Sequence, residues 1–254
     1  MTDSTKKSAP EFSCNLNRNQ LKYIAICGML LDHIAYLFQK FFYNFSWGAA
    51  LTFVFRTLGR ITAPVMSWFL VQGFIHTSSK KRYALRLFIF AIISQIPYYL
   101  IHSSSGLMAQ LNVIYTLLLS FLMLCVLESP LEAVPKWTLI FVLIAFTIFG
   151  DWAFFVPIMV LCFYLLRDNK KSLLIFYSIV SILVLASDIT ILCIKGYNWY
   201  LELWQAGMFL FIPLYLSYNG EPGSRAAFHK WFFYVFYPLH LLVLWAIVRA
   251  ISLA

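Results

Sequence analysis

The sequence predicts an all-α, polytopic membrane protein, a bundle of about nine transmembrane helices with a cytosolic N-terminus. The chain of 254 residues is 62% hydrophobic and only 11% charged, with a mean hydropathy of +0.79, which is more apolar surface than a soluble core of this size can bury. The apolar residues fall in runs of about membrane length. The lysines and arginines, which give a net charge of +9, cluster between these runs as they do in topology-setting loops. This clustering argues against nucleic-acid binding.

Each apolar run is long enough, or nearly so, to span a bilayer at about 1.5 Å per residue. In order along the chain, the nine expected spans are Leu21–Phe45, Ala49–Thr77, Leu85–Ile101, Leu111–Leu127, Trp137–Phe149, Trp152–Leu166, Ser172–Ile194, Leu203–Tyr218 and Trp231–Ile251. The fifth and sixth are short and meet at Gly150-Asp151, which also fits a single bent hairpin.

Residues 1–20 are polar and are expected to form a cytosolic tail, and residues 21–254 form a single membrane domain. The first apolar run is too long for a cleaved signal sequence and lacks a small-residue cleavage site, so we expect it to remain as a helix. With the N-terminus inside, most lysines and arginines fall on cytosolic connections, as the positive-inside rule requires. The five cysteines show no CxxC spacing, and we predict no metal site.

The first two predicted spans carry four ionisable side chains in their interiors: Asp32, His33, Arg56 and Arg60. Such groups are costly in lipid and normally face a packed or wet interior where they have a task. Lys22 and His33 are eleven residues apart, which is about three helical turns, so both project from one face and lie roughly 16 Å apart. That face places a cation at the cytosolic mouth and an imidazole deep in the membrane.

Asp32 points about 100° away from His33 and is badly placed to orient it, so its expected partner is Arg60 or Arg56 on the next helix. These arginines form an i,i+4 pair that can neutralise Asp32 and still hold an anion. Gln95 and His240 lie at a depth similar to His33, so polar groups converge near the midplane. Intramembrane prolines support a cavity there; they are Pro64, Pro97, Pro157, Pro213 and Pro238.

A series of short motifs in this order resembles the TraX family and covers most of the chain. They are Lys22-x2-Ala25-x3-Met29-x2-Asp32-His33, Leu58-Gly59-Arg60-x3-Pro64, Gly73-Phe74-x-His76-Thr77, Tyr83-x2-Arg86-Leu87, Ser94-Gln95-Ile96-Pro97, Leu111-Asn112-Val113-x2-Thr116-Leu117 and Phe236-Tyr237-Pro238-x-His240. The resemblance implies a multi-pass acetyltransferase of the bacterial inner membrane, and the family's namesake acetylates the N-terminus of conjugative pilin subunits. The Lys-x10-His spacing is also similar to an element of the membrane acyltransferases that O-acetylate surface sugars, so the implied donor is acetyl-CoA.

The resemblance and the spacing together suggest a mechanism. Acetyl-CoA would dock from the cytosol, and the acceptor, a pilin-like peptide or a surface glycan, would come from the outer side. His33 would act as general base or carry the acetyl group. We expect catalytic roles for His33, Asp32, Arg60 and His240, cofactor contacts from Lys22, Arg56, Lys80, Lys81, Arg82 and Arg86, and acceptor or oxyanion contacts from Gln95, Asn112 and Tyr115.

Other readings of these residues stay open. His33, His240 and Gln95 also fit interhelical hydrogen bonds, the Lys80–Arg86 run also fits a topology signal, and Asp32 with Arg60 also fits a packing ion pair. Midplane charges beside kinked helices also describe a transporter or flippase, although the sequence shows no repeated half. A structural assembly factor for a surface apparatus would not need His33. Four further residues lie near predicted helix ends, where we expect them to be solvated: Asp151, Asp188, His102 and His229.

Overall fold

The computed structural model describes residues 15–102, 110–224 and 226–253, so most of the predicted polar tail lies outside the described residues. Within these ranges the chain is helical, and its β structure is limited to two isolated bridges, Leu16 with Tyr218 and Leu111 with Gly150. The predicted all-α class is therefore confirmed for the part of the chain that the structure describes.

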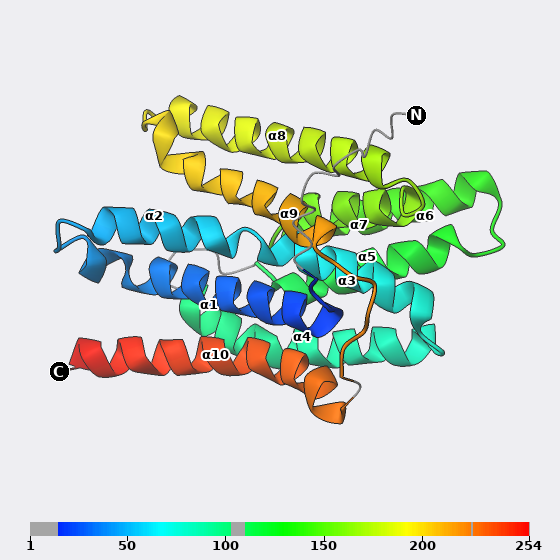
Figure 1. The fold of residues 1–254 in the computed structure, drawn as a ribbon, viewed down its shortest axis with the longest axis horizontal. Helices are drawn as coiled ribbons and strands as arrows, with labels where there is room; N and C mark the ends of the chain where they lie inside the picture. Colours follow the sequence, from blue (N-terminus) through cyan, green and yellow to red (C-terminus); the bar gives the residue numbers. More distant parts are fainter. Residues whose placement is uncertain (1–14, 103–109, 225, 254) are drawn as a thin grey trace, which may run out of the picture.

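The helices follow one another in an up-and-down bundle (Figure 1). Their bounds are α1 Arg18–Phe42, α2 Gly48–Gly59, α3 Thr62–His76, α4 Lys80–His102, α5 Val113–Leu127, α6 Ala133–Phe146, the 3-10 helix η2 Thr147–Phe149, α7 Phe155–Leu165, α8 Lys170–Ile194, the 3-10 helix η3 Trp199–Leu210, α9 Phe211–Leu216 and α10 Ala227–Leu253. Among the described residues, four stretches are long and apolar enough to cross a membrane as single helices: Arg18–Phe42, Lys80–His102, Lys170–Ile194 and Trp231–Ile251.

The structure thus supports four of the predicted spans directly and does not confirm about nine. One reason is that the predicted second span is broken into α2 and α3 at Arg60–Ile61. Pro64 explains the break, because its nitrogen has no hydrogen for the carbonyl of Arg60, one turn earlier, and its ring crowds that carbonyl. Arg60 therefore lies at a discontinuity and forms the C-cap of α2.

The predicted eighth span is also irregular, because it begins as the twelve-residue η3 and continues as α9. At about 2.0 Å per residue, η3 covers roughly 24 Å, and α9 adds about 9 Å. Runs of 3-10 helix this long are uncommon and often mark a functional segment. With this stretched geometry, eighteen residues cover a length close to the roughly 30 Å of a bilayer's hydrocarbon core.

Two glycines let neighbouring elements approach α2 closely. A Cβ on Gly59 would overlap the side chain of Asp32 on α1, and a Cβ on Gly207 of η3 would overlap the backbone of Thr57. Small residues at such contacts are typical of helix pairs in membranes. The two contacts bring Asp32 from one side and η3 from the other side to the end of α2 that carries Arg56 and Arg60.

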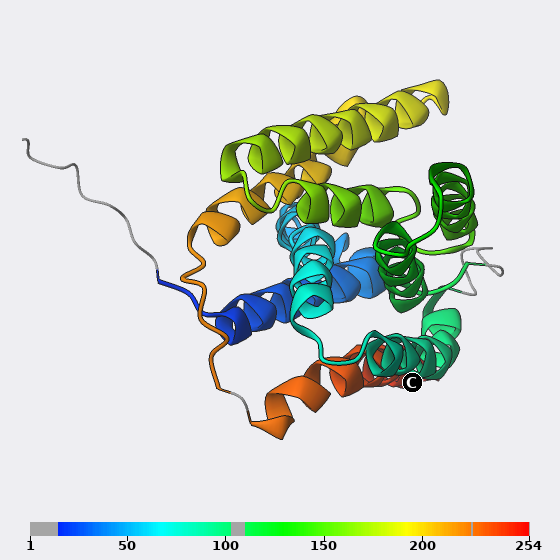
Figure 2. The same ribbon diagram turned by 90° about the vertical axis from the view of Figure 1, so that its right-hand side faces the viewer.

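Seen end-on, α3 occupies the centre of the bundle, with α1, α5 and α7 around it and α8 and α10 at opposite edges (Figure 2). Large apolar side chains are exposed on the outer faces of the helices, including Phe141 at 72% and Ile194 at 80%. Exposed apolar surface on this scale fits contact with lipid. The fold and composition together are those of a membrane protein.

Candidate functional site

A cavity of about 1060 Å³ lies within the bundle between α1, α3, α4, α7, α8 and α10. Its lining includes six of the residues singled out in the sequence: Lys22, Asp32, His33, Arg56, Arg60 and Arg86. Lys22 and His33 line the same cavity, as their eleven-residue spacing predicted. Among the described residues, no three His, Cys, Asp or Glu side chains are placed to hold a metal ion.

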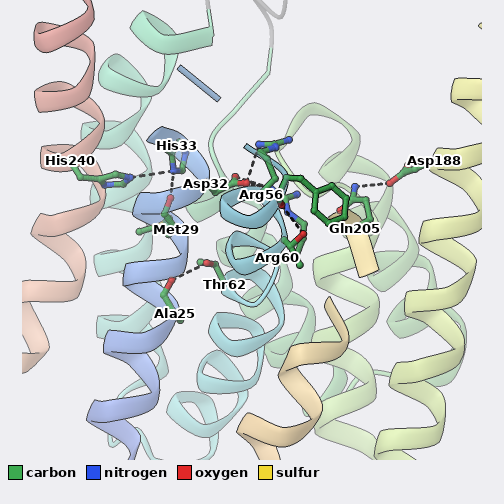
Figure 3. Close-up of polar contacts among 12 residues, drawn as sticks. Ala25, Met29, Asp32, His33, Arg56, Arg60, Thr62, Asp188, Gln205 and His240 are labelled. Carbon is green, nitrogen blue, oxygen red and sulfur yellow. Dashed lines mark hydrogen bonds and ion pairs between the residues drawn. The ribbon is translucent and has the colours of Figure 1, made fainter. Parts of the chain in front are cut away.

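Asp32 is the anion of a buried charge cluster between α1 and α2 (Figure 3). Arg60 Nη2 donates to both carboxylate oxygens at 2.7 Å, and Arg56 Nη1 lies 3.0 Å from Oδ1. Both arginines are therefore partners of Asp32, which confirms the prediction that its partner lies on the second span. One carboxylate facing two guanidinium groups leaves an excess positive charge beside the cavity.

Two tryptophans hold the arginines by cation–π contacts. The Trp204 ring of η3 lies 4.2 Å from the Arg56 guanidinium carbon and 4.5 Å from that of Arg60, and the Trp152 ring lies 4.9 Å from Arg60. Trp152 and Phe154 have φ angles of 56° and 59°, which bulky side chains rarely adopt. Such strain is typical of functional segments, and here it shapes the turn that covers Arg60.

His33 and His240 form a pair on facing helices (Figure 3). Each ring places Nδ1 2.8 Å from a carbonyl one turn earlier, Met29 for His33 and Phe236 for His240. Both neutral rings therefore carry hydrogen on Nδ1, an assignment made from these acceptors. His240 Nε2 then accepts, and it lies 3.5 Å from His33 Nδ1. His33 lines the cavity, whereas His240 is only 5% exposed and lies behind it.

The end of the cavity beside the start of α1 is lined by three cations: Arg18, Lys22 and Arg86. In the part of the chain that the structure describes, none of them has a carboxylate partner within ion-pair distance. The Nε atoms of Arg18 and Arg86 are buried without a hydrogen-bond partner, and Lys22 lies over the rings of Phe69 and Phe233. This end therefore offers positive charge and unused donors, which suits an anion.

Several predicted residues lie away from the cavity. Lys80 forms an ion pair with Glu128, and Lys81 and Arg82 are exposed on the same turn of α4 outside the cavity lining. The predicted acceptor contacts hold helices together instead: Asn112 caps α5 and donates to Ala91, Gln95 accepts from Asn112, and Tyr115 donates to the carbonyl of Phe146. Gln95 therefore lies at a depth similar to that of His33 but faces Asn112.

Four residues expected to be solvated at helix ends line the cavity: His102, Asp151, Asp188 and His229. All four side chains are partly exposed, so their solvation stays a prediction. Sequence reasoning also missed Arg18, Trp204 and Gln205 as site residues. Arg18 lies in the predicted polar tail, and Trp204 and Gln205 lie within the predicted eighth span. The sequence signal for Trp204 and Gln205 as site residues was a tryptophan next to a polar glutamine inside an apolar span.

Comparison with known proteins places the chain in a family. The family model described as TraX protein matches residues 17–248. The chain belongs to the TraX family. It is also 34% identical over 235 residues to a protein of Dichelobacter nodosus named probable fimbrial assembly protein FimC, serogroup H1, and the match covers 89% of this chain and 93% of that protein. No solved structure matches the chain.

The TraX motifs in this chain have physical roles in the cavity wall. Asp32-His33 supplies the carboxylate of the charge cluster and the histidine of the pair. In the motif Gly59-Arg60-x3-Pro64, the glycine admits Asp32, the arginine binds it, and the proline creates the helix break where the arginine lies. The motif Ser94-Gln95-Ile96-Pro97 fixes α4 to the start of α5.

Proposed function

We propose that this TraX protein is a multi-pass acetyltransferase of the bacterial inner membrane that moves an acetyl group from cytosolic acetyl-CoA to an acceptor at the outer side. The observation that carries this proposal is the cavity that joins a cationic mouth to His33 and Arg60. The named relative in fimbrial assembly and the family's link to pilin acetylation support a pilin-like peptide as acceptor. A surface glycan is the second acceptor class that the family resemblance implies.

The cationic mouth is the proposed site for the phosphates of CoA. Arg18, Lys22 and Arg86 provide positive charge and donors without a carboxylate that competes for them. Phosphate oxygens are strong acceptors that guanidinium and ammonium groups bind. From Lys22 the cavity follows α1 for roughly 16 Å to His33, and this is the path proposed for the pantetheine arm.

His33 is the proposed general base. Its Nδ1 hydrogen faces Met29 O and His240 Nε2, so the lone pair of Nε2 is left for the substrate. The acceptor nitrogen or oxygen attacks the thioester carbonyl while His33 Nε2 takes its proton. The C–S bond then breaks, and the CoA thiolate leaves with the proton from His33. The Nδ1–His240 contact stabilises the imidazolium that forms in between.

Arg60 is the proposed group that stabilises the developing oxyanion. It lines the cavity, it is 7% exposed, and its Nε has no hydrogen-bond partner. The excess positive charge of the Asp32–Arg56–Arg60 cluster favours a state in which negative charge develops nearby. Asp32 has a positioning role in this proposal, because it fixes the guanidinium of Arg60 through two hydrogen bonds.

The proposal is tested by transfer of label from acetyl-CoA to membrane peptides or glycans in wild type and in His33→Gln. We expect a loss of about 100-fold or more, the scale of general base catalysis. Thr190→Ala, an exposed position on α8, is the control for expression and folding. Equal transfer by His33→Gln and wild type would show that His33 is not the general base. If wild type neither transfers acetyl groups nor binds CoA, the proposed activity is refuted.

The donor mouth has its own test. Lys22→Gln removes a cation that lines the cavity, whereas Lys195→Gln removes a cation at the exposed C-cap of α8. We expect Lys22→Gln to raise the KM for acetyl-CoA by about 10-fold, since a charge-assisted contact contributes about 1.5–3 kcal/mol. An unchanged KM in Lys22→Gln, equal to that of Lys195→Gln, would place the phosphates elsewhere.

A further inference from the structure

The cavity has a second polar region, between α8 and η3, which the acetyl transfer proposed for His33 does not use. Its polar lining consists of Ser187, Asp188 and Gln205. Figure 3 shows Gln205 directed at Asp188, on the far side of the two arginines from His33. Asp188 lies six residues, or about 9 Å, before the end of a helix that is long and apolar enough to cross a membrane. An ionisable side chain in such a segment normally has a task.

Asp188 lacks a cation of its own. Within the described residues, neither Asp188 nor Glu202 has a lysine or arginine within ion-pair distance. Glu202 lies three residues before Gln205 in η3, and because a 3-10 helix has three residues per turn, both lie on one face of η3. The charge cluster between α1 and α2 has an excess of one positive charge, whereas these two carboxylates bring two negative charges. One further positive charge would balance them.

The amide of Gln205 is only half satisfied. Gln205 Nε2 donates to Asp188 Oδ2 at 2.7 Å, whereas Oε1 has no partner although the residue is only 9% exposed. The two amide atoms are assigned by this hydrogen bond, because an ionised carboxylate accepts and cannot donate. Buried polar atoms without a partner are rare in folded proteins, and an ion is one of the groups that explain them.

A cation beside Asp188 would reverse the amide. If the amide turns by 180°, Oε1 takes the place of Nε2, which lies 2.7 Å from Asp188 Oδ2. Two oxygens this close repel each other unless a cation contacts both, and metal–oxygen distances of about 2.4 Å allow that. The turn breaks no other hydrogen bond of the amide oxygen, because Oε1 has none in the present orientation. Ser187 and water in the cavity can supply further oxygen ligands.

A monovalent cation fits this region better than a divalent one. The site offers one carboxylate and one amide oxygen, and the missing charge is a single one. In the part of the chain that the structure describes, no three His, Cys, Asp or Glu side chains are placed to hold a metal ion. Oxygen ligands suit hard cations, and irregular helical segments at membrane depth are where transporters bind Na⁺.

We propose that Asp188 and Gln205 bind a monovalent alkali cation, with Na⁺ as the first candidate, and that this ion fixes η3 against α8. Trp204, the residue before Gln205, lies with its ring 4.2 Å from the guanidinium carbon of Arg56 and 4.5 Å from that of Arg60. An ion that fixes Gln205 therefore also fixes the ring that holds both arginines. The inference goes beyond the proposed acetyl transfer and does not depend on it.

The test is thermal unfolding of the purified full chain in detergent, in NaCl or in choline chloride at equal ionic strength. We expect saturating NaCl to raise the Tm of wild type by about 3 °C relative to choline chloride, because an ion that binds only the folded state stabilises it. Asp188→Asn removes the charge, keeps an oxygen for Gln205 Nε2, and should lose this response. Asp168→Asn, whose side chain is 88% exposed on a loop, is the matched control and should keep it.

A second variant separates the amide from the carboxylate. Gln205→Leu keeps the charge and removes one ligand, so the NaCl concentration that gives half of the Tm shift should rise by about 10-fold. Equal Tm values of wild type in NaCl and choline chloride would overturn the site, as would equal NaCl responses in Asp188→Asn and Asp168→Asn. A response to CaCl₂ and not to NaCl would overturn the monovalent assignment. None of these readouts needs turnover, so a failure of the proposed acetyl transfer would leave them unchanged.

Discussion

The substitution Asp32→Asn tests the charge cluster most directly. It keeps the shape of the side chain and leaves Arg56 and Arg60 as two buried cations that face each other without their carboxylate. Removing one partner of a buried pair typically costs about 3–5 kcal/mol. Here the Trp204 ring still contacts both arginines, and the cavity lies beside them, so we expect a loss of about 3 kcal/mol in the free energy of unfolding.

The assay is reversible denaturant unfolding in detergent micelles, followed by tryptophan fluorescence. A double variant, Asp32→Asn with Arg56→Gln, restores the original net charge of the cluster and should recover about 1–2 kcal/mol of the loss. Asp168→Asn, at an exposed site, should stay within about 0.5 kcal/mol of wild type. Wild-type stability in Asp32→Asn would refute the reasoning that the carboxylate neutralises buried cations. A double variant no more stable than Asp32→Asn would refute the charge argument alone.

Three further changes test the surroundings of the cluster and the ion pair between Lys80 and Glu128. Gly59→Ala places a Cβ against Asp32 and should cost about 1–3 kcal/mol and lower activity; unaltered stability in the same unfolding assay would contradict the close approach of α1 and α2. Trp204→Leu should lose about 1–2 kcal/mol with its cation–π contacts, whereas Trp199→Leu, 55% exposed on the same helix, should not. Hydrogen bonds from Lys80 and Tyr164 hold the pKa of Glu128 below its usual value, so its stabilising contribution is complete above about pH 4.5 and is lost as the pH falls further. Stability profiles of wild type and Glu128→Gln should therefore diverge above that pH by up to about 1 kcal/mol, and parallel profiles would contradict this.

The chemistry of the first two spans was predictable because helical geometry is regular. Eleven residues make about three turns, so Lys22 and His33 had to share a face, and both line the cavity. Adjacent residues point in different directions, so Asp32 needed a partner other than His33, and it binds Arg60 and Arg56. Pairing a carboxylate with arginines inside a membrane follows from the cost of leaving either one alone.

The same reasoning failed where the depth of a side chain could be counted but the direction in which it points could not. Gln95 lies at a depth similar to His33, but it faces Asn112 at the start of α5. Counting residues from the membrane edge fixes the level of a side chain along the helix axis and leaves its rotation about that axis open. The predicted number of spans is not confirmed for a related reason, since hydropathy records apolar length and not the break that Pro64 introduces between α2 and α3.

The position of Asp188 and Gln205 in the cavity wall depends on that irregular geometry. Asp188 lies six residues before the end of α8, and Gln205 lies six residues after the start of η3, which places them about 9 and 12 Å from those ends. The two side chains therefore meet at a similar level, and the Gly207 contact holds η3 against α2 so that this level is also that of the arginines. A regular helix in place of η3 would turn about 100° per residue and not about 120°, so Trp204 and Gln205 would no longer face Arg60 and Asp188 as they do. The 3-10 geometry of η3 is thus what places Gln205 at Asp188 and Trp204 at the charge cluster.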